Sequence, residues 1–148
     1  RRVNFEDMTA NRDAIGKASE EFAIEWEKNR LIGLGYQELT AKIEDRRDIP
    51  SYGYDYLSFS APGHERYIEV KSVGRDRKEA CFRFYLSENE LSVSNSAENS
   101  REYYFYLVLY GKDGKPCDLL ARHAKEFYSS SEISPCAYVV RFDLEEQK

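Results

Sequence analysis

The sequence predicts an α/β domain in which one mixed β-sheet is flanked by helices. One observation is that two kinds of segment follow each other along the chain. Apolar residues recur every three or four positions in some segments and at every second position in others. The first spacing is typical of helices and the second of strands. The other observation is the order of the segments, α-β-β-β-β-α-β-(α)-β, which favours a sheet with helices packed on it.

A long helix is predicted near the start of the chain, over residues 11–34. Its apolar residues form one stripe: Ile15, Ala18, Phe22, Trp26 and Leu31. Gly33 and Gly35 mark the end of this helix. Residues 36–44 alternate moderately in polarity and predict a first strand, and the segment 45–53, which contains Pro and Gly, predicts a loop.

The middle of the chain predicts a β-hairpin followed by a further strand. Residues 54–60 and 64–73 alternate and are rich in strand-forming residues, and residues 61–63 ("APG") form the turn between them. The charged segment 75–79 predicts a loop, and residues 80–86 alternate again and predict a strand.

The last part of the chain predicts a helix and two more strands. Ser87 followed by Glu90 is a capping-box pattern, so a helix is expected to begin there. The aromatic and β-branched run 102–111 predicts a central strand. Residues 118–129 fit either a strand end or a short helix, and residues 137–144 predict a last strand.

The composition is that of an ordinary globular protein, with 41% hydrophobic and 33% charged residues. The 148 residues suit one domain, which we expect to span 1–148 and to be excised from a longer protein, since the chain lacks an initiator Met. The three cysteines are odd in number and widely spaced, which favours a reducing compartment, the cytoplasm, over a disulfide framework. No apolar run approaches the length of a membrane span, so no membrane partner is expected.

The hairpin carries the most informative pattern. Side chains alternate faces along a strand, so Glu69 and Lys71 share one face, and Ile68, Val70 and Ser72 share the other. If the turn is the three residues 61–63, Ser60 pairs with His64 and Asp55 lies directly opposite Glu69. A slip of one residue in the turn would break this register.

Two adjacent carboxylates repel each other unless a cation lies between them. Oxygen ligands from Asp55 and Glu69 are what Mg²⁺ or Mn²⁺ prefers, with water and a substrate phosphate completing the coordination. Lys71 beside such a metal would orient the attacking water or stabilise charge on the phosphoryl oxygens. The pattern therefore predicts metal-assisted hydrolysis of a phosphodiester. The alternative is that these residues form a solvated sheet face. Asp48 in the preceding loop is a less favoured further ligand.

The pattern of Asp55 followed by Glu69-Val70-Lys71 resembles that of the PD-(D/E)xK nuclease superfamily, although Tyr54 stands where the superfamily's Pro would be. More closely, the chain resembles the domain at the C-terminus of the NO VEIN protein, which also occurs in bacterial restriction and defence proteins. The similarity lies in the collinear order of five segments: "IGKASEEF", "GYDYLS", "YIEVKSVG", "FYLSENE" and "YYFYLVLY".

This resemblance implies a restriction-endonuclease-like core and a Mg²⁺-dependent (or Mn²⁺-dependent) endonuclease acting on DNA. It also implies that Glu20, on the helix before the hairpin, joins Asp55 and Glu69 as a metal or water ligand. Glu21 is the adjacent candidate, and Glu27 is a less favoured one. The expected partners are DNA, other domains or subunits of a larger restriction or defence protein, and a second copy in a homodimer.

Two further readings stay open at this point. The first is a catalytically inactive module of the same fold that binds nucleic acid or protein; the net charge of −5 favours it weakly, since nucleic-acid binders often carry a basic excess. The second is the same chemistry acting on RNA. Five basic residues in two short clusters flank the hairpin and could contact phosphates: Arg46, Arg47, Arg75, Arg77 and Lys78. Glu90 is expected to serve mainly in helix capping.

Overall fold

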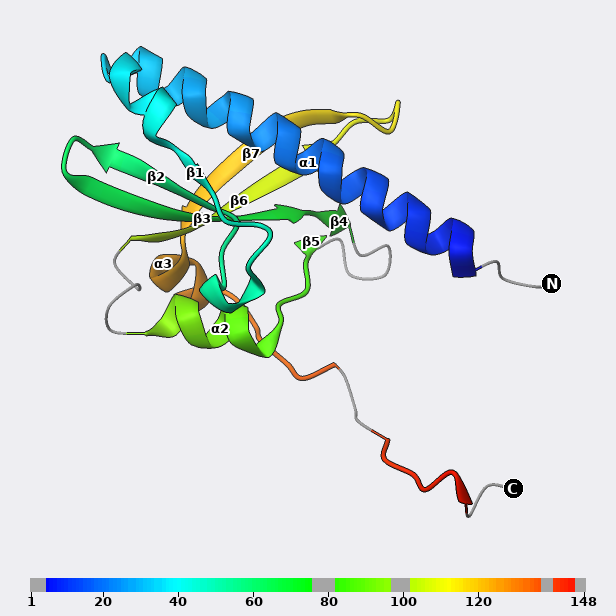
Figure 1. Ribbon diagram of the computed structural model, residues 1–148. Coiled ribbons are helices and arrows are strands. Elements are labelled where there is room, and N and C mark those ends of the chain that lie inside the picture. The colour runs from blue at the N-terminus through cyan, green and yellow to red at the C-terminus, as the bar shows by residue number, and fades with distance from the viewer. Residues whose placement is uncertain (1–4, 76–81, 97–101, 137–139, 146–148) are drawn as a thin grey trace.

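The structure is a computed structural model that describes residues 5–75, 82–96, 102–136 and 140–145 (Figure 1). Its helices are α1 (Phe5–Gly33), α2 (Glu88–Asn95) and α3 (Ala124–Ser129), with two short 3₁₀ helices, η1 (Gln37–Lys42) and η2 (Pro50–Tyr52). Its strands are β1 (Glu44–Asp45), β2 (Tyr56–Ala61), β3 (His64–Ser72), β4 (Gly74–Arg75), β5 (Phe82–Arg83), β6 (Tyr103–Tyr110) and β7 (Pro116–His123).

Five of these strands form one mixed sheet in the order β1-β2-β3-β6-β7. β3 and β6 are parallel, and the other neighbours are antiparallel. The chain reaches β6 from β3 through β4, β5 and α2, because parallel neighbours need a crossover connection. The sheet lies between α1 on one face and α2 and α3 on the other (Figure 1). The predicted class is confirmed: this is an α/β fold with a mixed sheet flanked by helices, consistent with a restriction-endonuclease-like fold.

The two faces of β6 explain why its run of large residues forms a central strand. Tyr106 and Val108 are buried in the core under α1, together with Ile68 and Val70 of β3 and Ala23 of α1. The edge of the Trp26 ring packs on Tyr106, with ring centroids 5.3 Å apart. The predicted stripe therefore covers the sheet at Phe22 and Trp26, whereas its first residue, Ile15, is exposed.

The alternate residues of β6 fill the opposite core. Tyr103, Phe105 and Leu107 pack there with Leu57 of β2 and with the side chains of α3. The face of β3 that carries Glu69 and Lys71 is this one, since Glu69 pairs with Phe105 and Lys71 with Leu107 in the parallel register. The predicted division of β3 into two faces is thus confirmed.

The hairpin has the predicted register but a different turn. Residues Tyr56 to Phe59 pair with Ile68 to Glu65, as expected for Asp55 opposite Glu69. The turn, however, is only Pro62 and Gly63, because Ala61 rather than Ser60 pairs with His64. An irregularity between Phe59 and Ala61 leaves Ser60 as an extra residue on β2. This bulge compensates for the shorter turn and keeps the register unchanged.

The strand predicted over residues 36–44 is wrong for most of its length. Residues 37–42 form η1, and only Glu44 and Asp45 form a strand, β1. The Thr40 hydroxyl donates to the Gln37 carbonyl, and Leu39 is the only buried side chain of η1. Alternating polarity stabilises a strand only where every second side chain is buried, and here only one is. Local hydrogen bonds therefore decide the conformation of residues 37–42.

Three later predictions need adjustment. The strand predicted over residues 80–86 is short, Phe82–Arg83, and pairs with β4 rather than with the main sheet; residues 80 and 81 lie outside the described part. Residues 118–129 supply both a strand, β7, and a helix, α3. The strand predicted over residues 137–144 is wrong where it is described, since residues 140–143 form no strand. Val140 and Phe142 are exposed, so their alternation has no sheet to pack against.

α2 packs closely against Gly53, in the segment before β2. Its φ of 73° is left-handed, and an added Cβ would lie 2.7 Å from Val93 Cγ2 of α2. Gly63 has a similar φ of 77° but open space around it. We expect Gly63→Ala to cost about 1–2 kcal/mol from the backbone alone, and Gly53→Ala about 1–3 kcal/mol more from overpacking. Urea unfolding of the two variants checks this; equal losses would contradict the close packing.

Candidate active site

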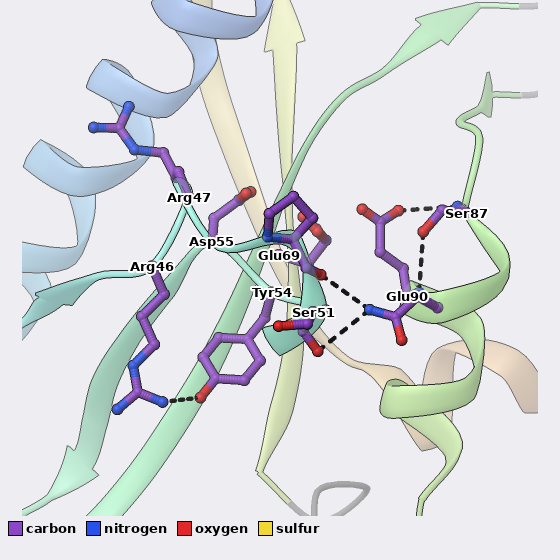
Figure 2. Close-up of a pocket in the computed structure, with 11 residues that line it drawn as sticks. Arg46, Arg47, Ser51, Tyr54, Asp55, Glu69, Ser87 and Glu90 are labelled. Carbon is purple, nitrogen blue, oxygen red and sulfur yellow. Dashed lines mark hydrogen bonds between the residues drawn. The ribbon is translucent and has the colours of Figure 1, made fainter.

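An open pocket of about 610 Å³ lies where the start of β2, the middle of β3 and the first turn of α2 meet (Figure 2). Three acids contribute to its wall: Asp55, Glu69 and Glu90. Two arginines, Arg46 and Arg47, line it as well. The remaining lining residues are Pro50, Ser51, Gly53, Tyr54, Ser87 and Asn89. The pocket therefore combines an acidic wall with basic and polar groups.

Asp55 and Glu69 are brought together by the hairpin. The Asp55 backbone N–H donates to the Ile68 carbonyl at 2.8 Å, and Asp55 Oδ2 accepts from the Val70 N–H at 2.8 Å. These bonds join Asp55, the residue just before β2, to β3 and hold its carboxyl group against the backbone of that strand. The carboxyl groups of Asp55 and Glu69 interact directly. The structure therefore places the two carboxyl groups next to each other, although Asp55 itself precedes the paired residues of β2.

Burial of this pair changes its protonation. Burial raises the pKa of Asp55 above its ordinary value. Burial first, and then the charge of Asp55, raise the pKa of Glu69 to about 11. Glu69 is only 3% exposed, and its Oε2 is buried with no hydrogen-bond partner among the described residues. At neutral pH the pair therefore keeps a proton, as two close carboxyls do when no cation lies between them.

Lys71 lies beside the carboxyl pair but is bound to a different acid. Its Nζ donates to Glu90 Oε1 at 2.7 Å, with the two side chains 16% and 22% exposed. Its positive charge also acts on Asp55 and on Glu69, in both cases favouring the ionised carboxyl. The structure thus brings Asp55, Glu69 and Lys71 into one neighbourhood, and adds Glu90 to it.

Glu20 lies outside the pocket. Its Oε2 accepts from Arg47 Nη1 at 2.5 Å, and its charge is close enough to disfavour ionisation of Asp55. α1 covers the sheet face opposite Glu69, as the bond between Ser19 Oγ and Ser72 Oγ (2.7 Å) shows. Glu20 as a metal or water ligand therefore stays a prediction, and Arg47 is its partner here.

The other acids considered as ligands lie elsewhere. Glu21 is exposed on α1, whereas Glu20 is partly buried. Glu27 is fully buried and bound within the core under α1. Asp48 lines a neighbouring pocket that does not include Asp55. The side chains of the second basic cluster, residues 75–78, lie outside the described part of the chain.

Two features of the site were missed from sequence. Glu90 was expected mainly to cap α2; it does so, but the same oxygen also binds Lys71. Arg46 stacks over the Tyr52 ring at 4.4 Å and donates to the Tyr54 hydroxyl. The three-residue spacing between Ser87 and Glu90 indicated the helix cap. No local pattern indicated that Glu90 would also contact β3.

Metal binding can be judged from the donor set. Within the described ranges, no group of three or more His, Cys, Asp or Glu side chains is arranged to hold a metal ion. The pair of Asp55 and Glu69 nevertheless offers hard oxygen donors, one of them buried and unpartnered. Mg²⁺ is commonly held by one or two carboxylates, with waters and substrate phosphate as its other ligands. The residues present therefore fit Mg²⁺ or Mn²⁺.

The fold is an α/β fold with a mixed sheet flanked by helices, and its pocket holds a carboxyl pair with a lysine nearby. The chain belongs to the family described as "Protein NO VEIN, C-terminal", whose model matches residues 19–120. The family resemblance is thus confirmed, whereas membership of the PD-(D/E)xK superfamily stays a prediction. No curated protein and no solved structure matches the chain. None of the helices described is long and apolar enough to span a bilayer.

Proposed function

We propose that this domain is a metal-dependent endonuclease that hydrolyses phosphodiester bonds in DNA, as the cleavage module of a restriction or defence system. One observation carries the proposal: the carboxyl groups of half-buried Asp55 and buried Glu69 lie together in the wall of an open pocket. Lys71 is nearby, and Glu69 Oε2 has no partner within the described residues. Burying two acids side by side is unfavourable unless a cation compensates for them. Family membership supports a nuclease-like or defence-associated module.

Asp55 and Glu69 are the residues that would hold Mg²⁺ or Mn²⁺. When bound, the metal would polarise a phosphoryl oxygen and lower the pKa of a coordinated water. Glu20 would assist only after leaving Arg47, to which it is bound in this structure. Lys71 would stabilise negative charge on the phosphoryl oxygens or orient the water that attacks phosphorus.

Two arginines of the pocket would hold the substrate. Arg46 and Arg47 line the same pocket as the carboxyl pair. Each is already bound to acids, Arg46 to Glu44, and Arg47 to Asp45 and Glu20. These acids fix the guanidinium groups in place, and contact with DNA phosphates positions a duplex without reading its sequence.

Lys71→Ala is expected to reduce cleavage at least ~100-fold, because removing one group that stabilises the developing charge typically costs that much. The measurement is cleavage of supercoiled and linear DNA with Mg²⁺ or Mn²⁺, with a chelator control. Lys112→Ala, which changes an exposed lysine in the turn between β6 and β7, is the matched control. Full cleavage by Lys71→Ala would remove this lysine from the mechanism. Single-stranded RNA run in parallel decides the substrate class.

The second candidate is a binding module of the same fold without catalysis. It is favoured by the ion pair of Arg47 with Glu20, one of the predicted metal ligands, and weakly by the net charge of −5. Calorimetric titration of Mn²⁺ separates the two candidates. Heat of binding that disappears in Asp55→Asn supports the nuclease, and its absence from the wild-type protein supports the binding module.

A further inference from the structure

The first turn of α2 contacts both β3, which carries Glu69 and Lys71, and the segment that leads to Asp55. Glu90 Oε1 accepts from Lys71 Nζ at 2.7 Å, on the strand that also carries Glu69. Asn89 Nδ2, one residue earlier, donates to the Pro50 carbonyl at 3.0 Å, in the segment that leads to Asp55. Figure 2 shows Glu90 and Ser87 on the opposite side of the pocket from Arg46 and Arg47. Two consecutive residues of one helix therefore hold the two segments that deliver the carboxyl pair and the lysine.

Helix capping alone does not explain Glu90. The capping box needs a side-chain acceptor for the Ser87 N–H, 3.1 Å from Glu90 Oε1, and glutamine supplies that acceptor as well as glutamate. The bond to Lys71 is different, because it joins two charged and largely buried groups. Glu90 therefore makes a second contact, a charge-assisted hydrogen bond to the lysine, that helix capping does not require.

α2 packs closely against the segment before Asp55. Val93, one helical turn after Glu90, lies so close to Gly53 that no Cβ fits between them. The Tyr103 hydroxyl donates to the Gly53 carbonyl at 2.5 Å and connects the same segment to β6. The contacts of Glu90 and Asn89 therefore belong to a closely packed arrangement of α2, residues 50–53 and the sheet.

We propose that the first turn of α2 organises the site, with Glu90 as a positioning residue that holds the Lys71 ammonium beside Asp55 and Glu69. Asn89 holds the segment that leads to Asp55 in the same arrangement. The role in catalysis rests on the proposed nuclease function, whereas the contact between Glu90 and Lys71 stands apart from it. Glu90 acts through Lys71 and does not itself bind the metal or the DNA.

Three variants separate positioning from capping. Glu90→Gln keeps the acceptor for the cap and removes the charge, Ser87→Ala weakens the cap and keeps the pair with Lys71, and Glu88→Gln neutralises an exposed acid of the same turn as a control. We expect Glu90→Gln to lower kcat at least tenfold, with KM for DNA and the Mn²⁺ dissociation constant within twofold of wild type. Ser87→Ala should lower the urea midpoint and reduce kcat less than Glu90→Gln does, and Glu88→Gln should change neither.

Two results would overturn the positioning role. One is wild-type kcat for Glu90→Gln. The other is a loss of Mn²⁺ affinity as large as that of Glu69→Gln, which would make Glu90 a metal ligand.

A double-mutant cycle gives a readout that does not depend on cleavage. Glu90→Gln, Lys71→Met and the double variant are compared in urea unfolding. We expect the two substitutions to be coupled at least fivefold in the folding equilibrium constant, and additivity would overturn the proposed contact. An inactive wild-type protein with intact coupling would reject the nuclease function but not the contact; an active protein without coupling would reject the contact alone.

Discussion

Replacing Glu69 with glutamine is expected to stabilise the domain and to abolish its cleavage of DNA. Glu69 is buried beside Asp55, and its Oε2 has no hydrogen-bond partner in the described part of the chain. A glutamine amide would donate to the Asp55 carboxylate without the proton that Glu69 must take up from solution at pH 7. The expected gain is roughly 1–3 kcal/mol at pH 7 without metal, the usual cost of an unsatisfied buried group. The same change removes a proposed ligand of the catalytic metal, so activity should fall to background.

The stability that Glu69→Gln adds should increase as the pH rises. Burial and the neighbouring Asp55 raise the pKa of Glu69 to about 11. The unfolded chain releases this proton near the ordinary carboxyl pKa of about 4.3. Between these values the folded state binds more protons than the unfolded state, so the stability of the wild-type protein falls as the pH rises. Glu69→Gln should flatten this slope, although the raised pKa of Asp55 leaves part of it.

Urea unfolding between pH 4 and pH 9, with chelator and then with Mn²⁺, checks both statements. Mn²⁺ should stabilise the wild-type protein and leave Glu69→Gln unchanged, because only the wild-type pair offers two carboxylates. Glu65→Gln, at an exposed position of β3, is the matched control and should follow the wild-type curve. A Glu69→Gln protein that is less stable than wild type at pH 7, or that still cleaves DNA, would contradict the carboxyl pair as a cation site.

Glu27→Ala is expected to destabilise the fold by about 3–5 kcal/mol, the typical cost of breaking a buried ion pair by removing one partner. Glu27 is 0% exposed and accepts from Arg30 Nε at 2.7 Å and Nη2 at 2.8 Å. It also accepts from the Ser58 hydroxyl at 2.6 Å and the Tyr106 hydroxyl at 2.5 Å. Its removal leaves a guanidinium and two hydroxyls buried without their acceptor.

Urea unfolding again provides the measurement, with Glu25→Ala as the control. Glu25 lies on the same helix, and its side chain is 70% exposed. Its change should stay within about 0.5 kcal/mol of wild type, as surface substitutions usually do. Arg30 also donates to the Phe59 carbonyl beside the bulge of β2, so Glu27→Ala should loosen the hairpin. A loss below about 1 kcal/mol would show that the network contributes little to stability.

The parts of the fold that sequence predicted well are those where a local pattern and burial agree. The alternation of β3 places Glu69 and Lys71 on one face and Val70 on the other, since both faces of the strand are covered. The register of the hairpin also follows, because a slip by one residue would bury the wrong set of side chains. The turn itself was less predictable, because a three-residue turn without a bulge and a two-residue turn with a bulge at Ser60 give the same register. The structure has the second of these.

The parts that sequence did not predict depend on contacts between distant segments. Lys71 and Glu90 meet because the crossover returns α2 to the face of β3, and nothing in either local pattern specifies this. Glu20 is bound to Arg47, a residue in a loop whose conformation the sequence did not reveal. The strands predicted from alternating polarity at 36–44 and at 140–144 were wrong for most of the first segment and all of the second. Alternating polarity forms a strand only where a neighbouring strand and a core are present.

The parallel pairing of β3 with β6 also has a consequence for the order in which the site forms during folding. The β2–β3 hairpin closes a short loop, which is fast, whereas β3 and β6 meet only after the long crossover has closed. Asp55 and Glu69 therefore come together early, while water still solvates both. Lys71 acquires its partner only when α2 docks at the end. Docking of α2 thus brings a third acid, Glu90, to a place where two carboxyl groups and Lys71 already lie together.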